Sequence, residues 1–164
     1  GLDMYLSAKR YLSDWRDADK PIIEKLKAIP ELIPSSDLRP KYVILEAAYW
    51  RKANQIHRWF VENVQNGTDD CGHYWVPRAQ LHLLVDLCKQ ILADKSQAKD
   101  LLPTQDGFFF GGTTYDEWYY SDLDATVTML EKALREPDAL VRLGALHAAE
   151  ALPPERRGSL AAPL

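Results

Sequence analysis

Cysteine is scarce in this chain, and long apolar runs are missing from it. The 164 residues include two cysteines, Cys71 and Cys88, which form no CxxC pair. Two isolated thiols exclude a cysteine-based metal finger, and we expect both to be reduced. No stretch approaches 18 consecutive apolar residues, so no membrane span is predicted. No signal peptide opens the sequence, and we therefore expect a cytoplasmic protein.

A basic excess is missing as well. The chain has 20 Lys and Arg residues against 24 Asp and Glu residues, which gives a net charge of −4. Domains that bind nucleic acid through its phosphates usually carry a strong positive excess, so direct nucleic-acid binding is not expected. An acidic protein is better suited to contact basic protein surfaces. The length and the 46% hydrophobic content predict a globular chain with a hydrophobic core.

Motifs that would indicate a familiar catalytic site are not found. The sequence contains no GxxxxGK[ST], GxSxG, HExxH or GxGxxG pattern. Asp69, Asp70, Cys71 and His73 carry groups that ligate metals, but their spacing matches no ligand box. A turn after Asn66-Gly67 explains them better, and a pairing of Cys71 with a histidine as a nucleophile has no other support. We predict no bound metal and no cofactor.

The periodicity of the apolar residues predicts an α+β fold. Residues 2–8 and 42–50 favour strands, and Phe108–Phe110 a third short strand. Helical spacing covers residues 22–29, 51–65, 78–92 and 123–134, the last capped by Ser121 or Asp122. After Pro137, residues 138–152 predict an alanine-rich helix. We therefore expect a small antiparallel sheet of about three strands packed by four to five helices, with residues 1–136 as one domain and 137–164 as a helical extension and tail that is dispensable for folding.

One candidate binding patch lies around the start of the second predicted helix. Its residues are Trp50, Arg51, Asn54 and His57. On a helix, positions three apart are neighbours, so Asn54 and His57 would lie side by side, with Arg51 close by. Arginine beside tryptophan suits a small anionic ligand, such as a carboxylate or phosphate. The alternative is a solvated helix face with the tryptophans partly in the core.

The second candidate patch lies in an unusually aromatic stretch. Residues 107–120, GFFFGGTTYDEWYY, hold seven of the 17 aromatic residues, counting 5 Trp, 8 Tyr and 4 Phe. Three consecutive phenylalanines on a strand point to alternate faces, so at least part of the run should be core. After the glycines, rings and carboxylates alternate, which is typical of recognition surfaces. The candidate residues there are Tyr115, Asp116, Glu117 and Trp118; support for the last helix is the alternative role.

Three segments resemble a known group of sequences. GLDMYL at the start, AYWRKANQIHRWFVENVQNGTDDC in the middle and LLPTQDGFFFGGTTYDEWYYSDL late in the chain look like small uncharacterised proteins of bacteriophages and prophages. The resemblance covers about residues 1–135. It implies expression in the cytoplasm of a bacterial host and an accessory role, with no known catalytic residues.

Together these observations predict a protein that works by binding. The resemblance to phage proteins implies that the target is a host or defence-system protein, which this chain would inhibit in an anti-CRISPR-like role. The alternative is a small-molecule or nucleotide-binding protein, or an enzyme, with a pocket formed by segments 50–57 and 115–118. In an enzyme, Arg51 would hold an anion, His57 would act as acid or base, and Asp116 or Glu117 would orient the histidine.

Overall fold

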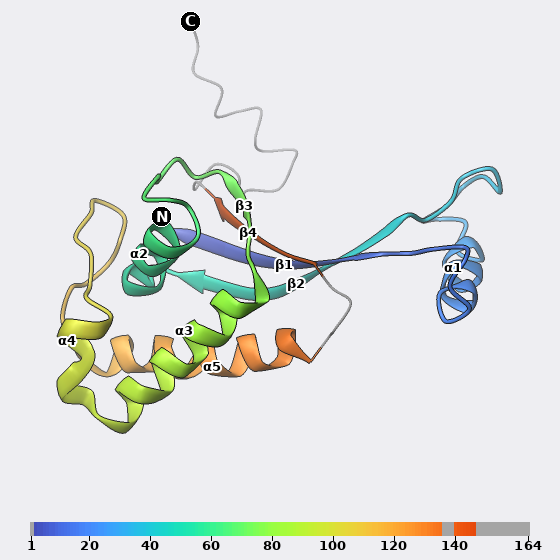
Figure 1. Cartoon of the computed structure of the whole chain (residues 1–164). Helices are drawn as coiled ribbons and strands as arrows, with labels where there is room; N and C mark the ends of the chain where they lie inside the picture. Colours follow the sequence, from blue (N-terminus) through green and yellow to red (C-terminus); the bar gives the residue numbers. More distant parts are fainter. Residues whose placement is uncertain (1, 136–139, 147–164) are drawn as a thin grey trace, which may run out of the picture.

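The computed structural model describes residues 2–135 and 140–146 and confirms the α+β class. Its sheet is antiparallel and has the strand order β2-β1-β4-β3 (Figure 1). The strands are β1 (Asp3–Tyr11), β2 (Tyr42–Arg51), β3 (His73–Trp75) and β4 (Leu140–Leu146). The two strands predicted nearest the start of the chain are thus confirmed, and they form the long part of the sheet.

β1 follows the alternation that its sequence predicts. Met4 and Leu6 are fully buried, whereas Tyr5 and Ser7 between them are partly exposed. β1 pairs with β2 along its whole length, with an irregularity between Leu6 and Ser7. Beyond it the two strands continue as a ribbon that leads away from the body of the protein to α1 (Lys20–Lys27) (Figure 1). We call this ribbon and α1 the arm.

Helices α3 and α5 cover one face of the sheet, side by side (Figure 1). The helices of the body are α2 (Asn54–Asn63), α3 (Arg78–Ala93), α4 (Ala98–Leu101) and α5 (Glu117–Leu134), with a short 3-10 turn, η1 (Lys95–Gln97), before α4. The largest fully buried side chains of the body are Met4, Leu6, Ile56, Phe60, Leu81, Leu84, Ile91, Leu102, Leu123 and Leu130. Three of the predicted helices are confirmed as α2, α3 and α5. The apolar stripe of each helix faces this core, as the helical spacing predicts.

The strand predicted at Phe108–Phe110 is wrong. These residues form a turn in which the amide of Phe110 donates to the carbonyl of Gly107, and Phe108 and Phe109 are 93% and 58% exposed. The neighbouring Gly111 has a φ of +89°, which only glycine adopts without strain. Glycines on both sides of a three-residue apolar run favoured a turn over a strand. Only Phe110 packs inward, against the ring of His57.

The helix predicted at residues 138–152 is also wrong where the structure describes it. Residues 140–146 form β4, which pairs with β1 on one side and β3 on the other; the rest of the predicted helix lies outside the described residues. The free edge of β1 offers backbone partners, and such tertiary pairing overrides local helix propensity. The division at residue 136 stays a prediction, although the place of β4 inside the sheet counts against a dispensable extension.

Candidate functional site

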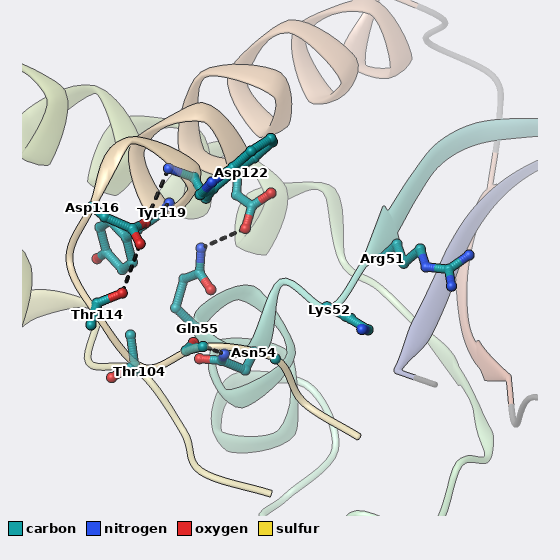
Figure 2. A pocket seen from close by; sticks show the side chains of 12 residues that line it. Arg51, Lys52, Asn54, Gln55, Thr104, Thr114, Asp116, Tyr119 and Asp122 are labelled. Atoms are coloured by element: carbon teal, nitrogen blue, oxygen red, sulfur yellow. Dashed lines mark hydrogen bonds between the residues drawn. The ribbon is translucent and has the colours of Figure 1, made fainter. Parts of the chain in front are cut away.

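Segments distant in the sequence meet around a pocket of about 290 Å³ (Figure 2). They are the end of β2 with the start of α2, residue 104 with the loop at 111–114, and the first turns of α5. The lining residues are Arg51, Lys52, Asn54, Gln55, Thr104, Gly111, Gly112, Thr114, Asp116, Trp118, Tyr119 and Asp122. Four of the eight residues predicted from the sequence line it: Arg51, Asn54, Asp116 and Trp118. The other four, Trp50, His57, Tyr115 and Glu117, do not.

Asn54 holds the loop that closes one side of the pocket. Its side chain is only 2% exposed, and its Nδ2 donates to the carbonyls of Phe110 (3.1 Å) and Gly112 (2.8 Å). Its Oδ1 accepts from the backbone amide of Gln105 at 2.9 Å. These three hydrogen bonds use both donor positions of the Asn54 amide and one of the two acceptor positions of its oxygen. Asn54 therefore positions the loop and is not free to bind a ligand.

Asp116 caps α5, where Ser121 or Asp122 was predicted to do so. Its Oδ1 accepts from the amides of Trp118 (3.1 Å) and Tyr119 (3.2 Å), and its Oδ2 accepts from the hydroxyl of Thr114 at 2.7 Å. These hydrogen bonds, the one from Thr114 first, lower the pKa of Asp116. The helix begins earlier than predicted because Asp116 supplies the oxygen that the first-turn amides need.

Asp122 is a carboxylate of the pocket that was not among the site residues predicted from the sequence. Its Oδ2 accepts from Nε2 of the buried Gln55 at 3.1 Å (Figure 2). Burial raises the pKa of Asp122, and the charge of Asp116 adds to this, while the hydrogen bond from Gln55 opposes it. Within the part of the chain that the structure describes, no Lys, Arg or His forms an ion pair with Asp122. The signal in the sequence that pointed to Asp122 was its place directly before Leu123, a buried position of α5.

Arg51 and Lys52 line the other side of the pocket. Both are exposed, and in Figure 2 their side chains extend away from Asp116 and Asp122. Lys52 has a φ of 58°, and its amide donates to the carbonyl of Leu2 at 2.7 Å. Positive φ is uncommon outside glycine, and the turn it makes ends β2 and starts α2. The pocket therefore has carboxylates on one side and cationic residues at the other.

Trp50 and His57 belong to the interior. Trp50 is 3% exposed, and its indole Nε1 donates to Oγ1 of Thr126 at 2.8 Å. His57 is 1% exposed, and its Nε2 lies 3.0 Å from Oδ2 of Asp69. The sequence placed His57 next to Asn54 on a polar ridge, but this face of α2 is covered by the 104–112 loop. His57 thus does not converge with Arg51 and Asp116 on the pocket.

The aromatic residues at the start of α5 divide between support and exposure. Tyr115 is half-buried, and its hydroxyl accepts from the amide of Thr104 at 3.2 Å. Trp118 lines the pocket and is 81% exposed. Glu117 is exposed and lies outside the lining of the pocket. Trp118 is therefore the exposed aromatic residue at the start of α5 and is accessible to a partner.

The buried state of His57 makes stability depend on pH. Burial lowers the pKa of His57 below its usual 6.5, and the nearby Asp69 only partly opposes this. Below about pH 6.5, His57 therefore binds a proton more readily in the unfolded chain than in the folded chain. The contribution of neutral His57 to the free energy of unfolding is therefore fully present above about pH 6.5. It is lost as the pH falls, by at most about 1.4 kcal/mol per pH unit.

The measurement is urea unfolding at pH 7.5 and pH 5.5 for the wild type and His57→Gln, with His73→Gln as the control at an exposed histidine. The wild type and the control should lose more stability at pH 5.5 than His57→Gln does. An unchanged pH dependence in His57→Gln would show that other groups cause it.

No set of three or more His, Cys, Asp and Glu side chains is placed to hold a metal ion among the described residues. In the same part of the chain, no helix combines the length and apolar character needed to cross a bilayer.

Comparison of the sequence with protein-family models, with curated proteins and with solved structures gave no significant match.

Proposed function

We propose that this protein acts by binding another protein through the exposed aromatic residues of the segment 107–118. The observation that carries the proposal is the exposure of three large rings within eleven positions: Phe108 at 93%, Phe109 at 58% and Trp118 at 81%. Single exposed rings are common on protein surfaces, but a group of them in one short segment is typical of an interaction site. Aromatic side chains are also the residues most often responsible for binding energy.

The segment is fixed in place although its rings are exposed. The side chain of Asn54 bonds to backbone groups at residues 105, 110 and 112, and the amide of Leu2 donates to the carbonyl of Phe109 at 3.3 Å. Asp116 anchors the other end by capping α5. A segment that is ordered before binding loses little conformational entropy in the complex. These contacts support a preformed binding surface.

The identity of the partner is the more specific part of the proposal. The resemblance to phage and prophage proteins supports a host or defence-system protein of the bacterial cytoplasm, which this chain would inhibit. The net charge of −4 favours a partner with a basic surface.

A capture experiment tests the proposal with matched variants. The tagged protein is incubated with lysate of a bacterial host, captured proteins are identified by mass spectrometry, and the main one is purified for affinity measurement. Phe108→Ala and Trp118→Ala should each weaken binding by roughly 30-fold, as for a residue contributing about 2 kcal/mol. Trp15→Ala is the control, because Trp15 is 92% exposed and lies in the arm.

Melting temperatures of these three variants should stay close to that of the wild type, since the side chains are exposed. Equal affinity of the purified partner for the wild type, Phe108→Ala and Trp118→Ala would contradict a role of this segment. Equal weakening by Trp15→Ala would show that the contact is not specific to it.

A second proposal concerns a small ligand in the pocket. It is favoured by the lining, which combines residues of the segments 50–57 and 115–118. Because His57 lies outside the lining, we propose binding without acid–base catalysis by that residue.

A further inference from the structure

We propose that the pocket between α2 and α5 binds a positively charged organic group, an ammonium or a guanidinium, against the carboxylate of Asp122. This inference rests on the second proposal above, a ligand in this pocket, and specifies the chemistry of that ligand. It does not depend on the protein–protein contact, because the cationic group can belong to a free molecule or to a side chain of a partner.

The first argument is the unbalanced charge of Asp122. Its Oδ2 accepts one hydrogen bond from Gln55, and its Oδ1 accepts none within the described residues. A partly buried carboxylate without a cation is costly, and in folded proteins such groups usually pair or serve a function. Gln55, itself 2% exposed, orients the carboxylate without neutralising it. A ligand cation would supply the missing charge and the missing donor.

The second argument is the surroundings of Asp122. Asp116 contributes negative potential, although its own oxygens are engaged by Thr114 and by the amides at the start of α5. Trp118, which is 81% exposed, lines the same pocket, whereas the ring of Tyr119 is buried against Tyr115 and Tyr120. An exposed aromatic ring near a carboxylate attracts organic cations through its π electrons. The carboxylate, the second negative charge and this ring together favour a cation over a neutral ligand.

The third argument is size. The pocket has a volume of about 290 Å³, at the lower end of the range for small-molecule sites. This volume suits a single amine or guanidine with a short alkyl chain and is small for a nucleotide. It is also the size of an inserted lysine or arginine side chain.

The positions of Arg51 and Lys52 allow the two possible sources of the cation to be distinguished. They line the pocket, but in Figure 2 their side chains point away from Asp122, so they leave the space beside the carboxylate free. A free amino acid carries a carboxylate that these residues can bind. A side chain within a polypeptide carries none, and it would gain nothing from Arg51.

The test is a titration of the full-length ¹⁵N-labelled protein, followed by NMR at constant ionic strength. The compounds are butylguanidine, arginine, and arginine capped as the N-acetyl amide. The side-chain amide of Gln55 is the reporter, because it donates to Asp122. We expect saturable shifts of this signal in the wild type and at least tenfold weaker binding by Asp122→Asn. Asp124→Asn is the matched control on an exposed position of the same helix and should bind like the wild type.

Each outcome decides one question. Binding of capped arginine as tight as that of butylguanidine supports a partner's side chain as the source. If free arginine binds more tightly than butylguanidine, and Arg51→Ala reduces its affinity to that of butylguanidine, a free amino acid is supported as the source. The absence of saturable shifts with all three compounds overturns the proposal. Equal affinity in the wild type and Asp122→Asn overturns it as well, while leaving the test of Phe108 and Trp118 unaffected.

Discussion

A chain that ends at Glu136 is expected to lose its native sheet. This truncation removes β4, which lies between β1 and β3 and pairs with β1 from Asp3 to Lys9. β3 would then have no strand to pair with, and β1 would have one unpaired edge. Domains are typically stable by only about 5–15 kcal/mol, so the loss of an internal strand should leave the protein largely unfolded or molten at 25 °C.

The measurement is thermal unfolding followed by circular dichroism, with an NMR spectrum to detect native packing. A chain that ends at Leu146 is the control, because it keeps every strand pairing that the structure describes. It should melt cooperatively near the temperature of the full chain. If the chain ending at Glu136 also does so, residues 1–136 fold alone, as the sequence alone predicts, and the sheet does not depend on β4.

Trp50→Ala should destabilise the protein by about 3–5 kcal/mol, the range found for removing a buried large aromatic side chain. Trp50 packs edge-on against Phe60, with ring centroids 5.7 Å apart, and bonds to Thr126 of α5. It therefore joins β2 to α2 and α5 in the core. Urea unfolding at pH 7.5 gives the change in free energy.

Two further substitutions show what the lost stability is due to. Trp50→Phe keeps a ring but removes the donor to Thr126, and it should cost less than Trp50→Ala. Trp118→Ala removes the same side chain from an exposed position and should leave stability nearly unchanged. If Trp50→Ala were as mild as Trp118→Ala, the assignment of Trp50 to the core would be wrong.

The sequence predicts the elements whose pattern repeats over many residues. In β1, alternating apolar residues specify a strand with one buried face, and in α3 the stripe of Leu81, Leu84 and Cys88 specifies the buried side of a helix. Such patterns are local, so they need no knowledge of the partner element. The phenylalanine run at 108–110 is only three residues long, too short for a reliable strand pattern, and its flanking glycines favour the turn that the structure has. The residues of β4 were predicted as helix, and they form a strand by pairing with β1 and β3, which lie far away in the sequence.

The site is only partly predictable for the same reason. The sequence predicts Arg51 and Asn54 in one patch and Asp116 and Trp118 in another, and the two segments meet only in the alternative interpretation; in the structure these four residues line one pocket. It cannot show that Asn54 is bonded to the 105–112 loop, because the partners lie more than fifty residues away. The contact between Gln55 and Asp122 spans a similar separation and gives no local pattern.

The arm has a small buried cluster of its own. At its tip, Leu12 and Ile23 are buried, and Arg10 forms an ion pair with the buried Asp19 at 2.6 Å. This small cluster lies at the opposite end of the ribbon from α3 and α5 (Figure 1). Regions with few contacts to the main core open locally at a lower free energy than the whole molecule. Amide hydrogens of α1 should therefore exchange with solvent through fluctuations that leave the core intact, and the tip can change its conformation without disturbing the pocket.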